Sequence, residues 1–170
     1  MSSAPPPVII KPKGQHTATL IFLHGLGDTG HGWAEEMDDI VPDYVKVVCP
    51  TANSMPVTGN SGMVMPAWYD IRHFEQGNDD SREDLEACDA SSEMLMRLIE
   101  KEANELPNGK ESRIMIGGFS QGGGVVNNTL FKLKQTLAGA IVLSTYIPGT
   151  YLRFKHLSSF LNMHVFSISI

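Results

Sequence analysis

Residues 113–124 of this chain read Arg-Ile-Met-Ile-Gly-Gly-Phe-Ser-Gln-Gly-Gly-Gly, an apolar run that breaks into glycines around one serine. Within it, Gly118–Gly122 matches the pattern G-x-S-x-G, which marks a sharp turn from a strand into a helix with a nucleophilic serine at its tip. The serine of such a turn has a strained backbone, and a side chain at either flanking glycine would collide with the neighbouring strand or helix. Ser120 is therefore the first candidate for a catalytic nucleophile.

A purely structural turn is the alternative interpretation of this motif. The bare five-residue pattern also arises by chance, so on its own it is a weak signal. Its surroundings strengthen it, because residues 113–116 predict a short buried strand and residues 125–133 can continue as a helix. That is the setting the motif requires, and we favour a nucleophile over a structural turn.

Composition limits the class of protein. The 170 residues predict one domain with enough chain to bury a core. An apolar content of 42% and a charged content of 19% are ordinary for a soluble globular protein. The net charge of -6 gives no reason to expect nucleic acid or an anionic membrane as a partner.

The cysteines and the N-terminal residues indicate a compartment. Cys49 and Cys88 form no C-x-x-C pair, and no His or Cys residues stand at metal-ligand spacing. The first residues lack the pattern of a signal peptide, and no apolar run reaches the ~18 residues that a membrane span needs. We therefore expect a cytoplasmic protein with no transmembrane segment, in a reducing compartment.

Strand-like and helix-like segments alternate along the chain. The sequence predicts strands over residues 8–10, 18–23, 44–49, 113–116, 137–143 and 163–170, and helices over residues 32–40, 125–133 and from a capping box at 81–84 onward. Prolines on both sides of residues 8–10 predict an edge strand there. This alternation predicts an α/β fold with a mostly parallel sheet and helices on both faces.

The glycine-rich loop of residues 24–30, which follows the strand at 18–23, has two interpretations. A phosphate-binding loop is disfavoured, because neither an acidic residue at the expected spacing nor G-K-[ST] follows the glycines. The second interpretation is part of an oxyanion hole, which serine hydrolases build from a backbone N–H in such a loop and the N–H after the nucleophile. Leu26 and Gln121 would be these donors. His24 is interpreted as a structural histidine that holds the loop.

Residues 51–67 show no clear periodicity but are unusually apolar, with several methionines. Methionine adapts to irregular surfaces and to flexible ligands, so one hypothesis is a groove for an acyl chain. Met63, Met65 and Trp68 are the candidate substrate contacts. The alternative, that these side chains only cap the core, stays open.

Three segments of the sequence, residues 20–30, 65–70 and 117–123, together resemble the acyl-protein thioesterase family, the lysophospholipase or carboxylesterase type of α/β-hydrolase. They occur in the family's order and lie within about residues 11–146. The resemblance implies a cytoplasmic serine hydrolase that removes palmitoyl-like groups from cysteine thioesters of S-acylated proteins and cleaves lysophospholipids and simple esters. It implies Ser120 as nucleophile, Leu26 and Gln121 as backbone oxyanion donors, and no cofactor.

The residues after the serine depart from the family pattern. Triad residues in this fold follow the order Ser, then Asp or Glu, then His. All 19 acidic residues lie at or before Glu111, so His156 and His164 have no acid after Ser120 to orient them. Losing the base costs on the order of 10⁶ in kcat and leaves roughly 10³–10⁴ over water. We therefore expect residues 1–170 to form a single, C-terminally shortened and incomplete α/β-hydrolase domain with impaired catalysis.

Two further hypotheses concern function, and one concerns association. The chain could be a non-catalytic acyl-binding or decoy module that keeps the groove without the proton-transfer pair. Alternatively, His24 and Asp28 could replace the missing base, although that loop should face the serine with its backbone. We also expect the apolar C-terminal strand around Val165 and Ile168 to be exposed and to promote self-association.

Overall fold

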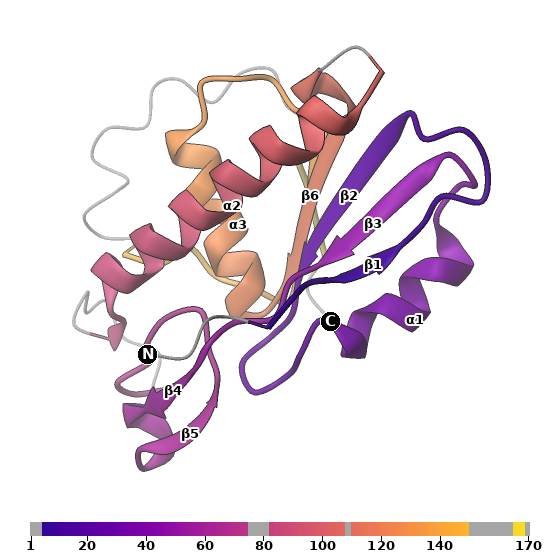
Figure 1. Cartoon of the computed structure of the whole chain (residues 1–170). Coiled ribbons are helices and arrows are strands. Elements are labelled where there is room, and N and C mark those ends of the chain that lie inside the picture. Colours follow the sequence, from indigo (N-terminus) through magenta and orange to yellow (C-terminus); the bar gives the residue numbers. More distant parts are fainter. Residues whose placement is uncertain (1–4, 75–81, 108–109, 150–164, 169–170) are drawn as a thin grey trace.

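The computed structural model describes residues 5–74, 82–107 and 110–149, and the backbone of residues 165–168 (Figure 1). Its central sheet has the strand order β1-β3-β2-β6-β7-β8. The strands are β1 (Val8–Ile10), β2 (Ala18–Leu23), β3 (Val45–Cys49), β6 (Ile114–Phe119), β7 (Gly139–Leu143) and β8 (Val165–Ile168). Only β1 runs antiparallel to its neighbour within this sheet. The predicted mostly parallel sheet and its proline-flanked edge strand are confirmed, with boundaries that differ by a few residues.

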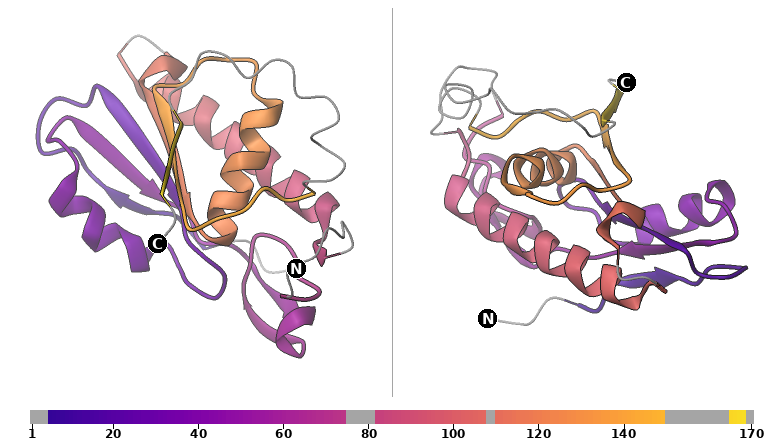
Figure 2. Two further views of the ribbon diagram at one scale, coloured as in Figure 1. Left: turned by 180° about the vertical axis from the view of Figure 1, so that it is seen from behind. Right: turned by 90° about the horizontal axis from the view of Figure 1, so that it is seen from above.

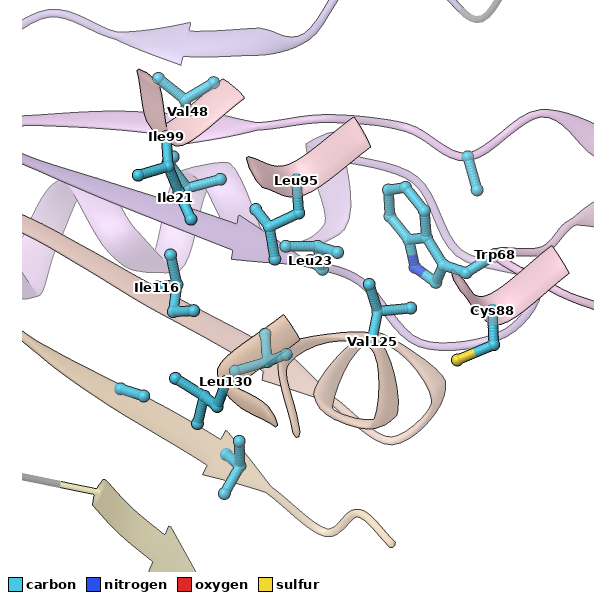
Figure 3. Close-up of a cluster of buried hydrophobic side chains, with 14 of the residues drawn as sticks. Ile21, Leu23, Val48, Trp68, Cys88, Leu95, Ile99, Ile116, Val125 and Leu130 are labelled. Carbon is cyan, nitrogen blue, oxygen red and sulfur yellow. The ribbon is translucent and has the colours of Figure 1, made fainter. Parts of the chain in front are cut away.

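Helices cover both faces of this sheet, as predicted. The helix α1 (His31–Ile40) lies on one face, and α2 (Leu85–Glu105) and α3 (Gln121–Lys132) lie on the other (Figures 1 and 2). Side chains of β2 alternate between the two faces, which explains its continuous apolar run. Leu20 and Phe22 pack with α1, whereas Ile21 and Leu23 pack with α2 and α3 (Figure 3).

One part of the α1 face is not covered by a described helix. An apolar groove of about 470 Å³ lies there, beside α1 and over the strands β6 and β7. Met115, Ile141 and Leu143 contribute to its lining. The strand β8 forms the edge of the sheet beyond β7, at the opposite end from β1. Self-association through β8 stays a prediction, because its side chains lie outside the described residues.

The start of α2 differs from the predicted capping box. The helix begins at Leu85, and Asp84 is its N-cap, with a carboxylate that accepts a hydrogen bond of 2.9 Å from Ala87 N. Glu83, the residue before this N-cap, forms an isolated antiparallel bridge with Ile71. The box predicted at residues 81–84 is therefore wrong, and Ser81 itself lies outside the described residues.

A hairpin that the sequence did not predict occupies the stretch that lacked periodicity. The strands β4 (Ser54–Val57) and β5 (Met63–Pro66) pair antiparallel, and the short helical turn η1 (Thr58–Asn60) follows β4. Figure 1 shows the hairpin projecting beyond one end of the central sheet. The backbone N–H of Gly27 donates a hydrogen bond of 2.9 Å to the carbonyl of Pro66, which places β5 beside the loop after β2.

Candidate active site

Ser120 lies in the turn between β6 and α3. Its backbone has φ 49° and ψ -116°, a conformation that costs a non-glycine residue free energy and persists only when its surroundings enforce it. Two hydrogen bonds do so: Ser120 N donates to the carbonyl of Leu143 at 2.9 Å, and Gly124 N donates to the carbonyl of Ser120 at 3.1 Å. The residue as a whole remains partly exposed at the tip of the turn.

The flanking glycines are required by close backbone contacts. A Cβ atom on Gly118 would lie 2.5 Å from the carbonyl carbon of Gly122. A Cβ atom on Gly122 would overlap the backbone carbonyl oxygens of Leu23 and His24. Because these neighbours are backbone atoms of the sheet and its adjoining loop, they cannot move aside as a flexible side chain could. The steric reason given for the motif is therefore present in the structure.

The loop after β2 lies against this turn. A Cβ atom on Gly25 would be 3.5 Å from the Cβ of Ser120. Among the described residues, no hydrogen bond is donated by the backbone N–H of Leu26 or of Gln121. The first of these belongs to the loop and the second begins α3. Both predicted donors thus lie close to the turn and have no partner among those residues.

His24 is buried in the loop and its ring is fully hydrogen-bonded. The backbone N–H of Ala52 donates to Nε2 at 3.0 Å, so Nε2 is the acceptor and Nδ1 carries the proton. Nδ1 lies 2.7 Å from the carbonyl of Gly25 and donates to it. Burial lowers the pKa of His24, while the bond to Gly25 partly offsets this effect. The ring therefore supports the loop, in agreement with the structural interpretation of this histidine.

Asp28 is also engaged within the loop. One carboxylate oxygen accepts a hydrogen bond of 2.7 Å from Thr29 N. The carboxylate packs closely on Gly32, in the first turn of α1, where a Cβ atom would overlap it. His24 and Asp28 both have defined structural partners, which disfavours them as a replacement for the catalytic base.

The side chain of Gln121 has a role that the sequence analysis did not predict. It is 1% exposed, and its carboxamide oxygen accepts a hydrogen bond of 3.0 Å from Trp68 N. Its nitrogen donates a bond of 2.7 Å to the carbonyl of Tyr69. The sequence signal was an amide side chain between the candidate nucleophile and the three glycines at 122–124, where a buried polar group must find partners.

The three candidate substrate contacts lie in different environments. Trp68 is 6% exposed and donates its indole N–H to the carbonyl of His24 at 2.8 Å, so it supports the loop from within the core. Met65 is half-buried, with its sulfur beside Gly27. Met63 is 60% exposed on the hairpin. The two methionines thus lead from the loop toward solvent, and contact between any of the three residues and a substrate stays a prediction.

Two other properties of the described residues bear on function. They bring together no group of three or more His, Cys, Asp or Glu side chains able to hold a metal ion. Nor does the described part of the chain contain a helix long and apolar enough to cross a membrane.

Known proteins resemble this chain over most of its length. An acyl-protein thioesterase 1 of Cryptococcus neoformans is 42% identical over 143 residues, which are 82% of this chain and 58% of that protein. The acyl-protein thioesterase 1 homolog 2 of Dictyostelium discoideum is 41% identical over 86% of this chain and 65% of its own length. The crystal structure of Zea mays acyl-protein thioesterase 2 superposes with a TM-score of 0.73 at 28% identity, covering 90% of this chain and 68% of that one.

The chain thus spans 58% to 65% of the length of these first two relatives. A family model described as phospholipase/carboxylesterase matches residues 4–165. The shared fold, with helices on both faces of a mostly parallel sheet, agrees with this match. The chain belongs to the phospholipase/carboxylesterase family of α/β-hydrolases, as its resemblance to acyl-protein thioesterases predicts.

Proposed function

We propose that this chain represents a serine hydrolase of the acyl-protein thioesterase type. Its substrates would be palmitoyl-like thioesters on protein cysteines, together with lysophospholipids and simple carboxylic esters. The observation that carries the proposal is the strained, partly exposed Ser120 beside two backbone N–H groups, of Leu26 and Gln121, that have no partner among the described residues. Relatives named acyl-protein thioesterases, 41% to 42% identical to this chain, support the choice of substrate class.

The chemistry follows from these groups. The hydroxyl oxygen of Ser120 would attack the acyl carbon and form a C–O bond, its proton would pass to solvent water, and negative charge would develop on the former carbonyl oxygen. The N–H groups of Leu26 and Gln121 would stabilise that charge, and each such donor typically contributes ~2.7–4 kcal/mol to the transition state. The bond from the acyl carbon to sulfur or oxygen then breaks, and the leaving thiolate or alkoxide takes a proton from water. Hydrolysis of the acyl-enzyme releases the carboxylic acid and restores the hydroxyl of Ser120. This scheme needs no cofactor.

The acyl chain would lie along the methionines of the hairpin. Met65 adjoins Gly27 in the loop of residues 24–30, called the oxyanion loop below, and Met63 extends the apolar surface outward. Met55 and Met65 also pack against the core, so capping of the core and contact with an acyl chain are both compatible with their positions. Met63, at 60% exposed, has no such packing role.

A polypeptide of these 170 residues alone would be a poor hydrolase. No carboxylate side chain follows Glu111 in the sequence, and both ring nitrogens of His24 already have backbone partners. Binding and the oxyanion donors would leave roughly 10³–10⁴-fold acceleration over water. The same facts favour, as the second candidate, a non-catalytic module that binds acyl chains.

A cytoplasmic location and a single incomplete domain over residues 1–170 are part of the proposal. Cys49 and Cys88 are both buried and form no disulfide with each other, as is usual in a reducing compartment. The expected partners are S-acylated proteins or lysophospholipids as substrates, without nucleic acid.

Hydrolysis of p-nitrophenyl octanoate tests these candidates, with Ser120→Ala as the inactive variant and Ser112→Ala, on an exposed turn, as the matched control. Slow hydrolysis that Ser120→Ala abolishes and Ser112→Ala preserves supports the hydrolase. If the protein binds octanoate but Ser120→Ala hydrolyses the ester no more slowly than wild type, the acyl-binding module is supported instead. Fluorophosphonate labelling of Ser120 at the rate of a complete serine hydrolase would overturn the expected impairment.

A further inference from the structure

We infer that the side chain of Gln121 is a positioning residue, which sets the spacing between the two oxyanion donors through a hydrogen-bonded bridge over Trp68. This inference rests on the proposed function, because it concerns the same site. It assigns Gln121 two separate tasks: its backbone N–H faces the reacting oxygen, while its carboxamide holds the element that supports the opposite donor.

The first half of the bridge joins α3 to the segment after β5. The carboxamide of Gln121 accepts from Trp68 N at 3.0 Å and donates to the carbonyl of Tyr69 at 2.7 Å. Both partners are backbone atoms of consecutive residues. A side chain that satisfies them must carry an acceptor and a donor at fixed spacing, as a carboxamide does. Since Gln121 is 1% exposed, water cannot take over this function.

The second half of the bridge joins the same segment to the oxyanion loop. The indole N–H of Trp68 donates to the carbonyl of His24 at 2.8 Å, two residues before Leu26. The indole and imidazole rings also pack together, with centroids 4.9 Å apart. The hydroxyl of Ser91, in α2, donates to the carbonyl of Trp68. Trp68 is therefore fixed through its backbone N–H, its carbonyl and its indole.

This arrangement matters because the two donors belong to different elements. Leu26 lies in the loop after β2, and Gln121 begins α3. Catalytic groups must be held to within about 0.5 Å, and a misplacement of about 1 Å can cost on the order of 10² in rate. Loss of the bridge would therefore slow attack by Ser120 even where the sheet and its helices remain folded.

The variant Gln121→Glu tests the bridge by pH. When protonated, the introduced carboxyl has an acceptor and a donor in the places of the carboxamide groups, and burial favours this form. When ionised, it has no donor and repels the carbonyl of Tyr69. The measurement is the rate at which a fluorophosphonate labels Ser120 at pH 5.5 and pH 8.5, given as a ratio to the wild-type rate. His24 and Tyr69, the titratable residues whose backbone carbonyls accept hydrogen bonds in the bridge, are present in both proteins, so the ratio isolates the introduced group.

We expect a ratio near one at pH 5.5 and a loss of about tenfold at pH 8.5. Gln135→Glu, the same change at an exposed position, should keep a ratio near one at both pH values. Trp68→Phe keeps the buried ring but removes the indole donor, and it should slow labelling about fivefold at both pH values while melting cooperatively.

The outcomes separate this inference from the function on which it rests. If wild type and Ser120→Ala label equally, the proposed function itself fails. If wild type labels at Ser120 but Gln121→Glu gives the same ratio at both pH values, fast or slow, only the bridge is overturned. Labelling of Trp68→Phe at the wild-type rate would equally exclude a role for the hydrogen bond from the Trp68 indole to the carbonyl of His24.

Discussion

The hydroxyl of Thr145 donates a hydrogen bond of 2.6 Å to the backbone carbonyl of Ser120, which joins the loop after β7 to the strained turn. The same side chain leaves no room for a Cβ atom on Gly123, since such an atom would lie 2.7 Å from both the Cβ and the hydroxyl oxygen of Thr145. A residue after the neighbouring strand thus helps to enforce a backbone conformation that Ser120 would not adopt alone.

The variant Thr145→Val should therefore be destabilised. It keeps the shape of the side chain but removes the donor, and we expect the free energy of unfolding to fall by about 1 kcal/mol. Urea denaturation measures this change. Thr136→Val, at an exposed position, is the control and should lie within about 0.5 kcal/mol of wild type. Equal stability of the two variants would show that the bond to Ser120 contributes nothing.

The contact of Gly122 with the end of β2 predicts a larger effect. In Gly122→Ala the new methyl group would overlap the carbonyl oxygens of Leu23 and His24, so the start of α3 must move away from the sheet. We expect the free energy of unfolding, measured by urea denaturation, to fall by at least about 3 kcal/mol. This is the upper end of the usual cost of adding a methyl group to a packed core. In the control Gly14→Ala the new atom would meet its nearest neighbour at 3.5 Å, an ordinary contact, and stability should change little.

The observed start of α2 leads to a third prediction. Replacing the N-cap in Asp84→Ala leaves the N–H of Ala87 without its acceptor, which typically costs ~1 kcal/mol of stability. Asp84→Asn retains an acceptor and should remain close to wild type. Thermal melting of the two variants side by side checks this, and equal losses in both would contradict capping by Asp84.

The sequence was sufficient wherever one local rule determined the structure. The apolar run before Ser120 predicted a buried strand, and the flanking glycines predicted the strained turn because only a missing Cβ atom fits there. The continuous apolar run of residues 18–23 predicted a strand with two covered faces. These features depend on residues adjacent in the chain.

Features that depend on distant partners could not be predicted in the same way. The hairpin β4–β5 was missed because prolines at 56 and 66 obscure the strand pattern. The capping box was misplaced because the bridge between Ile71 and Glu83 sets the start of α2. The role of the Gln121 side chain required knowledge of where Trp68 lies, 53 residues away in sequence.

The ion pairs of Lys46 are another feature that the sequence could not predict, because a lysine within a buried strand gives no indication of its partner. Its ammonium lies 2.7 Å from a carboxylate oxygen of Glu102 and 2.6 Å from one of Glu105, and so joins β3 to α2. The side chain of Glu102 is 0% exposed. The variant Lys46→Met would leave that carboxylate buried without its cation, and we expect a loss of about 3–5 kcal/mol at pH 7. In the matched control Lys13→Met, the lost partner is the partly exposed Asp38, and the change should not exceed about 1 kcal/mol.

The same cluster predicts how stability depends on pH. The hydrogen bond from Lys46 lowers the pKa of Glu105 below its usual 4.5, so its stabilising effect is complete above pH 4.5 and is lost as the pH falls through the lowered value. Burial alone would lower the pKa of Lys46, but hydrogen bonds to Glu102 and Glu105 outweigh it and raise the pKa above 10.5. The stabilising effect of Lys46 is therefore complete below pH 10.5 and is lost as the pH rises through the raised value.

The variant Lys46→Met has already lost both contributions, so the difference in urea midpoint between this variant and wild type should narrow from pH 7 toward pH 3. A difference that stays constant over this range would show that the pairing of Lys46 with Glu105 does not contribute to stability.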